Sequence, residues 1–206
     1  MNRKEFMRLG GSHLRNALMG WFSSWEDPEE PGPAEPPPAP VMLRGLRPPG
    51  AIAEERFLEA CTRCRLCVEA CPHEAIALAG APDGYPEGTP CLPSVAAKPC
   101  HLCEDMPCVA ACETGALLPL PAEEVSMGIA EIDPDLCFAY RGQLCDYCID
   151  RCPFPDEAIA SDEQGRPVVN PDRCVGCGLC AYICVTTPGA IAVRPRAAQK
   201  EEPCSA

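Results

Sequence analysis

Sixteen of the 18 cysteines in this 206-residue sequence fall into four groups of four with similar spacing. In every group the last two cysteines are separated by three residues, and in the first and fourth groups each earlier pair is separated by two. Three such thiolates can wrap around one cuboidal iron–sulfur cluster, while the fourth points away and, in two-cluster ferredoxins, ligates the other cluster. The spacing therefore predicts four [4Fe–4S] clusters. Their predicted ligands, group by group, are Cys61, Cys64, Cys67 and Cys71; Cys100, Cys103, Cys108 and Cys112; Cys137, Cys145, Cys148 and Cys152; and Cys174, Cys177, Cys180 and Cys184.

Other roles for these cysteines fit the pattern poorly. Zinc sites usually combine two Cys-x2-Cys pairs from separate places, and cysteines two residues apart rarely satisfy disulfide geometry. The second and third groups carry insertions, four residues between Cys103 and Cys108 and seven between Cys137 and Cys145, but keep the same ending. Cys91 and Cys204 lie outside the groups, and we assign them no function.

The spacing leaves open how the groups pair. The first and second groups can exchange their fourth cysteines, and the third and fourth groups can do the same. Alternatively the groups nest, first with fourth and second with third, as in the iron–sulfur subunits of molybdopterin oxidoreductases. Both arrangements use the same sixteen ligands.

No other motif in the sequence indicates catalysis. There is no phosphate-binding glycine loop, no flavin or nicotinamide fingerprint and no Ser/His/Asp pattern. His73 and His101 lie beside cluster cysteines. Histidine can replace cysteine on some clusters, but sixteen thiolates make such ligands unnecessary here. The pattern predicts redox relay, with no catalytic residues.

The elements that must position the cysteines are short. Helical turns are expected around the last three cysteines of each group. Apolar runs between the groups, around residues 75–78, 128–133, 158–160, 168–169 and 190–193, are typical of short strands, and an Asp/Gln/Gly turn among them favours β-hairpins. We predict an α+β, ferredoxin-like fold of two dicluster [4Fe–4S] modules with short β-hairpins and short helices.

Composition divides the chain into four parts. Residues 1–25 have apolar positions at roughly helical spacing and predict an amphipathic segment that could dock on a partner or a membrane surface. Residues 26–50 hold nine prolines and predict an extended linker. Residues 51–196 form the predicted four-cluster domain, and residues 197–206 a tail.

Charge and hydropathy exclude other classes of function. The formal net charge of −13 argues against nucleic acid, because binding phosphates needs clustered lysine and arginine. No apolar run approaches the ~20 residues of a membrane span, so no transmembrane segment is expected. Acidic electron carriers are steered to basic surfaces of their partners.

The sequence resembles the NapG/MauM family of ferredoxin-type proteins from residue 46 to about residue 195. The similarity lies in residues 46–51 and 57–61 before the first group, in residues 103–109 and 112–117 of the second, and in the seven-residue gap of the third. The resemblance implies four [4Fe–4S] clusters. It also implies redox protein partners, with electrons passing from a membrane quinol dehydrogenase toward a reductase or dehydrogenase system.

The N-terminus departs from that family. Residues 2–8 resemble the start of a twin-arginine signal with Arg-Lys in place of Arg-Arg, but residues 9–25 are not an apolar signal core. The related ferredoxin NapF is similar in carrying only a remnant. We therefore expect a cytoplasmic location, compatible with peripheral membrane association, against the alternative of periplasmic export by the twin-arginine route. The alternative function is a non-catalytic assembly or maturation partner that binds a redox enzyme.

Overall fold

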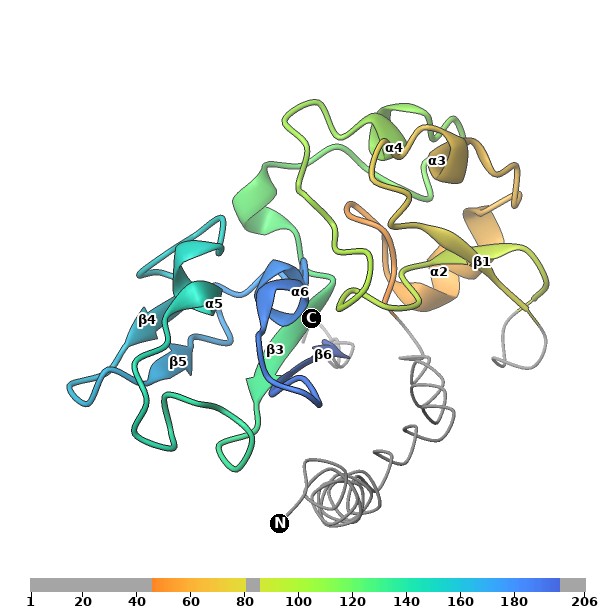
Figure 1. Cartoon of the computed structure of the whole chain (residues 1–206). Coiled ribbons are helices and arrows are strands. Elements are labelled where there is room, and N and C mark those ends of the chain that lie inside the picture. Colours follow the sequence, from red (N-terminus) through yellow and green to blue (C-terminus); the bar gives the residue numbers. More distant parts are fainter. Residues whose placement is uncertain (1–45, 81–85, 197–206) are drawn as a thin grey trace, which may run out of the picture. The chain divides into compact units, whose positions relative to one another are not determined.

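The computed structural model of this chain describes residues 46–80 and 86–196. The predicted N-terminal segment, most of the predicted linker and the tail lie outside these ranges. In the described ranges no helix is both long enough and apolar enough to cross a lipid bilayer. The elements are short and are connected by long loops (Figure 1).

Four short helices follow one rule: each contains the third cysteine of a group. The fourth cysteine lies just beyond the end of each helix, so its thiol can leave the loop that holds the first three. The helical turns predicted from the sequence are thus present, although the second cysteines lie before them. The helices are α3 (Leu66–Glu69), α4 (Pro107–Ala110), α5 (Tyr147–Asp150) and α6 (Leu179–Ile183).

Two further helical elements in the described part of the chain carry no cysteine. Helix α2 (Glu54–Ala60) leads directly into Cys61, and its first turn holds two glutamates, which interact favourably with the positive end of the helix dipole. A single 3₁₀ turn, η2 (Ala122–Glu124), precedes the third group.

Within residues 46–80 and 86–196 the strands form three two-stranded antiparallel sheets. Strands β4 (Ile159–Ser161) and β5 (Pro167–Val169) form a local hairpin, which confirms the predicted Asp/Gln/Gly turn. The Asp162 carboxylate accepts hydrogen bonds from the backbone N–H groups of Gln164 and Arg166 at 2.9 and 2.8 Å. These bonds fix the turn.

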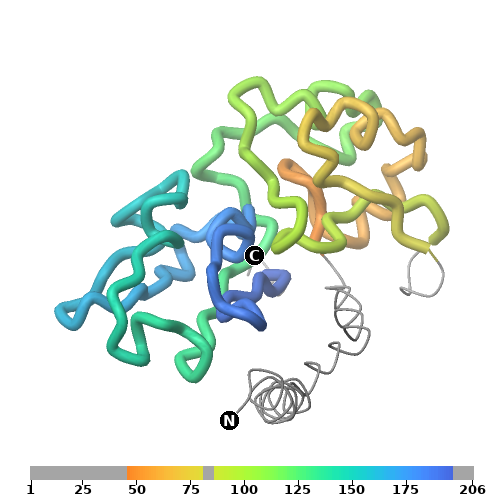
Figure 2. The backbone as a smooth tube through the Cα atoms, viewed as in Figure 1, coloured from red at the N-terminus to blue at the C-terminus, as the bar shows by residue number. Residues whose placement is uncertain are grey.

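The other strand pairs are not tight hairpins. Strand β3 (Gly128–Ile132) pairs with β6 (Ile191–Pro195) across the whole span of the third and fourth groups. Figure 2 shows these distant segments side by side. Strand β1 (Ala77–Ala79) pairs with β2 (Thr89–Cys91). Because β3 precedes the third group and β6 follows the fourth, their pairing ties the two ends of this part of the chain together.

The apolar core begins before the predicted linker boundary at residue 50. Leu46 is fully buried and Pro48 nearly so. The backbone carbonyl of Leu46 accepts a hydrogen bond from Leu92 N–H at 3.0 Å, and that of Gly50 accepts one from Leu118 N–H at 2.7 Å. Residues 46–50 therefore belong to the folded unit, because their backbone is hydrogen-bonded to two later segments.

Arg47 anchors this first segment. Its guanidinium is 6% exposed, donates to the Glu54 carboxylate at 2.8 Å and to the carbonyl of Pro90 at 2.9 Å, and lies 5.0 Å from the centre of the Phe57 ring. A buried charge is tolerated only when it is paired and hydrogen-bonded, as here. The contact joins the start of the folded unit to α2 and β2.

Candidate functional site

The thiols of the sixteen grouped cysteines gather in four sets of four. We name them sites I to IV. Each site combines the first three cysteines of one group with the fourth cysteine of another, and none of the sixteen forms a disulfide. Site I contains Cys61, Cys64, Cys67 and Cys112; site II contains Cys71, Cys100, Cys103 and Cys108; site III contains Cys152, Cys174, Cys177 and Cys180; and site IV contains Cys137, Cys145, Cys148 and Cys184.

Sites I, II and III are cavities with the thiols in their walls. Their volumes are about 370, 360 and 380 Å³, counted with their open mouths. Site IV is recognised from its thiols, because the Cys148 side chain interacts with those of Cys145, Cys137 and Cys184. In the part of the chain that the structure describes, no three Cys, His, Asp or Glu side chains converge closely enough for one metal ion. The thiols of sites I to III surround a volume, which suits a cluster with several irons.

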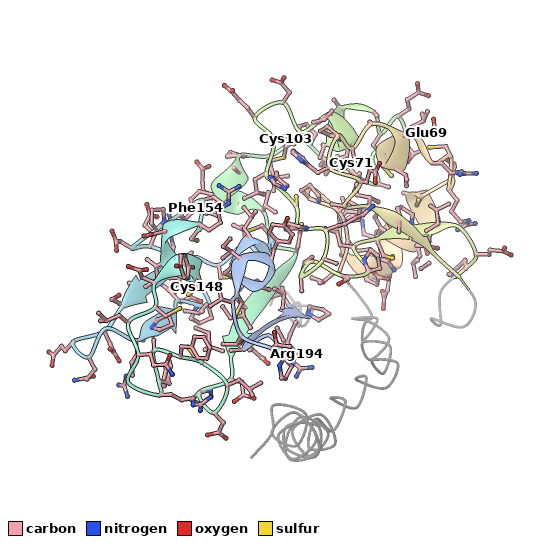
Figure 3. The ribbon with its side chains drawn as sticks, viewed as in Figure 1. Glu69, Cys71, Cys103, Cys148, Phe154 and Arg194 are labelled. Carbon is pink, nitrogen blue, oxygen red and sulfur yellow. The ribbon has the colours of Figure 1, made fainter. Side chains whose placement is uncertain are left out.

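The exchange of fourth cysteines settles the pairing that the sequence left open. Cys71 of the first group lies with the second group in site II, and Cys112 of the second lies with the first in site I. Cys152 and Cys184 are exchanged in the same way between the third and fourth groups. The nested alternative does not occur. Figure 3 labels Cys71 and Cys103, which come from different groups and line the same cavity.

The loops between the cysteines adopt an unusual backbone conformation. Arg63 and Arg65 have φ values of 57° and 72°, and Leu102 and Met106 have 49° and 36°. Side chains other than glycine seldom adopt positive φ, and such strain persists only where the surroundings demand it. Successive backbone N–H groups in such turns form concave nests for anions, including iron–sulfur clusters. The strained loops thus fit the predicted clusters.

Burial and the closeness of other thiols favour the neutral form of several site cysteines. Burial raises the pKa of Cys67 and Cys108 to about 11 and that of Cys100 and Cys148 to about 12. Neighbouring thiols add to each shift, because thiolates so close together repel one another. Iron in the cavity would reverse this preference, since a coordinating thiol loses its proton.

Family models match two parts of the chain. A 4Fe-4S binding domain matches residues 56–77, and a 4Fe-4S dicluster domain matches residues 129–185. Neither model covers the second cysteine group. Its cysteines are assigned to sites I and II from the geometry described above.

Curated relatives extend over most of the chain. The methylamine utilization ferredoxin-type protein MauM of Methylobacillus flagellatus is 44% identical over 169 residues, covering 77% of this chain and 71% of MauM. The chain belongs to the MauM and NapG family of ferredoxin-type proteins. The ferredoxin-type protein NapG of Escherichia coli is 40% identical over 171 residues, covering 76% of this chain and 73% of NapG. The ferredoxin-type protein NapF of the same organism is 32% identical over 146 residues, covering 68% of this chain and 80% of NapF.

The fourth cysteines of this ferredoxin-type protein are of two kinds. Those of sites II and III, Cys71 and Cys152, are followed by proline. Those of sites I and IV, Cys112 and Cys184, are followed two residues later by a threonine whose hydroxyl lies 3.6 and 3.2 Å from the sulfur. Spacing alone did not identify these threonines, although their matched positions in the sequence could have indicated them.

The Thr186 hydroxyl would donate to the Cys184 sulfur when that sulfur is a cluster thiolate. Its oxygen accepts a hydrogen bond from Ala190 N–H at 2.7 Å. A Cys184 thiolate has no proton to give, so the Thr186 hydroxyl must donate to it. At Cys112, burial alone would raise the pKa of the thiol, but hydrogen bonds from Leu117 N–H, at 3.4 Å, and from Thr114 lower it overall. Hydrogen bonds to cluster sulfurs tune the reduction potential.

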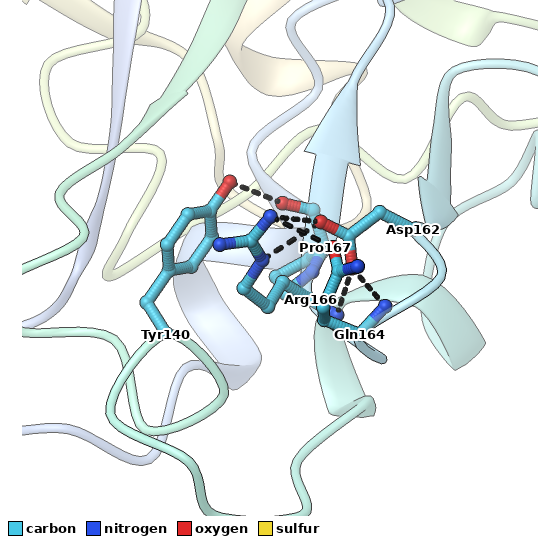
Figure 4. Close-up of polar contacts among 5 residues, drawn as sticks. All are labelled: Tyr140, Asp162, Gln164, Arg166 and Pro167. Atoms are coloured by element: carbon cyan, nitrogen blue, oxygen red, sulfur yellow. Dashed lines mark hydrogen bonds and ion pairs between the residues drawn. The ribbon is translucent and has the colours of Figure 1, made fainter.

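The seven-residue gap between Cys137 and Cys145 is held by the β4–β5 hairpin. Tyr140, within this gap, donates its hydroxyl to the carbonyl of Pro167 at 3.3 Å, and the Arg166 guanidinium lies 5.1 Å from its ring centre (Figure 4). Arg166 is in turn paired with Asp162 at 2.7 Å. This segment is therefore an ordered part of site IV.

The other residues singled out in the sequence are two cysteines outside the groups and two histidines beside them. Cys91 lies in β2, outside the four sites, and Cys204 lies outside the described residues. His73 and His101 stack with their ring centres 3.7 Å apart in the wall of site II. Their contact joins the first and second groups at the site that both supply.

Replacing Thr186 with valine should lower the midpoint potential of the site IV cluster by about 40 mV. In the wild type this hydrogen bond stabilises the reduced cluster, which is more negative, more than the oxidised cluster. Losing a difference of about 1 kcal/mol corresponds to that shift for a one-electron couple. Potentiometric titration followed by EPR measures it. Thr187→Val is the matched control, since Thr187 is exposed next to it and should leave all potentials unchanged. Equal potentials in wild type and Thr186→Val would contradict the assignment.

Proposed function

We propose that this protein is an electron-transfer protein that holds four [4Fe–4S] clusters, one in each of sites I to IV. All sixteen grouped cysteines would be ligands, arranged as two dicluster modules, the first two groups in one and the last two in the other. The observation that carries the proposal is the complete set of four thiols at each site. When bound, such clusters accept and donate single electrons at potentials that the protein sets.

The residues of the chain would hold the clusters and tune their reduction potentials. The N–H groups of Ala75 and Ala130 donate to the sulfurs of Cys71 and Cys174, each at 3.4 Å. These donors would stabilise the added negative charge of a reduced cluster. No step of substrate chemistry belongs to this proposal.

The partners we propose are redox proteins on either side of the relay. The donor would be a quinol dehydrogenase or another redox protein, and the acceptor a reductase or dehydrogenase. One relative's name refers to methylamine utilization, and we propose a related respiratory or oxidative chain here. The net charge of −13 favours partners with basic docking surfaces.

Iron and acid-labile sulfide analysis tests the cluster count. Protein purified without oxygen should contain about 16 iron and about 16 sulfide per chain, since each cluster has four of each. Cys91→Ser is the control and should keep the full content, because Cys91 lies outside the four sites. A content near half of this value, or zinc in place of iron, would refute the proposal.

The cytoplasmic location remains a prediction from residues 1–25, which lie outside the described ranges. Fractionation of cells that produce the full chain checks it. We expect the protein in the cytoplasmic fraction, with any membrane-bound portion released by salt. Recovery from the periplasm, dependent on the twin-arginine system, would instead support export.

A further inference from the structure

Thiols of neighbouring sites lie close enough to interact electrostatically, and these interactions place the sites in an order. Cys67 of site I interacts with Cys108 of site II, and Cys180 of site III interacts with Cys148 of site IV. Between these two pairs, Cys100 of site II interacts with Cys177 of site III. Sites II and III are therefore the inner pair, and sites I and IV lie at the ends.

A backbone hydrogen bond joins the inner pair directly. The N–H of Cys100 donates to the carbonyl of Cys177 at 2.9 Å. A second bond, from Met127 N–H to the Val175 carbonyl at 3.1 Å, lies two residues away. The loop around Cys177 is thus attached to segments that come before the third group.

Two glycines make this approach close. Gly176 and Gly178 flank Cys177 and are buried, with φ of 75° and 85°. A Cβ on Gly176 would lie 2.6 Å from Gly128 Cα, and one on Gly178 would lie 2.6 Å from Val95 Cγ2. Such contacts are far inside van der Waals distance, and Val95 is itself 2% exposed and cannot move away easily.

The first group provides an internal comparison. Its spacing is identical to that of the fourth, and the positions equivalent to Gly176 and Gly178 are Arg63 and Arg65. Both arginines also have positive φ, so the conformation itself does not require glycine. Arg63 and Arg65 are exposed, whereas the two glycines are covered by Gly128 and Val95. At positions 176 and 178, glycine is needed because a side chain would collide with Gly128 or Val95.

We infer that the Gly176–Cys177–Gly178 loop is the junction that connects the two modules electronically, with Gly176 and Gly178 as positioning residues that hold Cys177 against Cys100. This inference rests on the proposed four-cluster function. It makes the order of sites along the relay I, II, III, IV, which differs from the order of the cysteine groups along the chain. Exchange with partners would then occur at sites I and IV.

The test is EPR spectroscopy of the fully reduced, iron-loaded protein. Gly176→Ala and Gly178→Ala should lose the part of the spin–spin interaction that links the inner sites, while keeping the full iron content. Gly165→Ala is the matched control, because Gly165 has the same φ of 75° and a Cβ added there would meet no atom within 4 Å. The control should retain the wild-type spectrum. Unchanged spin–spin interaction in both junction variants would overturn the inference.

A second measurement uses only the wild-type protein and so does not depend on whether a variant binds iron. In the wild-type holoprotein, the amide of Cys100 should exchange its hydrogen slowly, because it donates to Cys177 within a covered contact. Hydrogen exchange of the peptide around residues 97–102 measures this. Rapid exchange there would overturn the junction. Wild-type protein with about half the expected iron would instead refute the proposed function, so the two failures are distinguishable.

Discussion

The structure depends on one constraint: no cysteine group can complete a site by itself. Three thiols close on one cavity, and the short helix that carries the third of them directs the fourth into the neighbouring cavity. Every site therefore needs two segments of chain, and each pair of groups must fold together. The helices, strands and turns are arranged around this exchange, which explains why the elements are so short.

The exchange also indicates where stability comes from. Helices of four or five residues are far too short to be stable alone, and the sheets have only two strands each. Apolar burial by residues such as Phe57 and Leu92 contributes, and the site thiols are shared between the loops of paired groups. Burial raises the pKa of Cys67, Cys100, Cys108 and Cys148, so cluster binding at these thiols would release protons and couple to folding.

Much of the site was predictable from sequence, because cysteine spacing reflects the geometry of the ligand set. The groups, the helical turns and the Asp162 hairpin follow from local patterns. The pairing of groups did not follow, since both arrangements need the same local spacing, and the choice is made by distant contacts such as β3 with β6. The different roles of Arg63 and Gly176 could not be predicted either. The two positions are equivalent in the sequence, but different segments pack against them.

In both modules each fourth cysteine completes the site of the paired group. Diffraction from crystals of the iron-loaded protein, recorded at the iron absorption edge, tests it most directly. We expect four iron centres, with Cys112 on the centre held by Cys61, Cys64 and Cys67, and Cys184 on the one held by Cys137, Cys145 and Cys148. A centre on which Cys112 joins Cys100, Cys103 and Cys108 would contradict it.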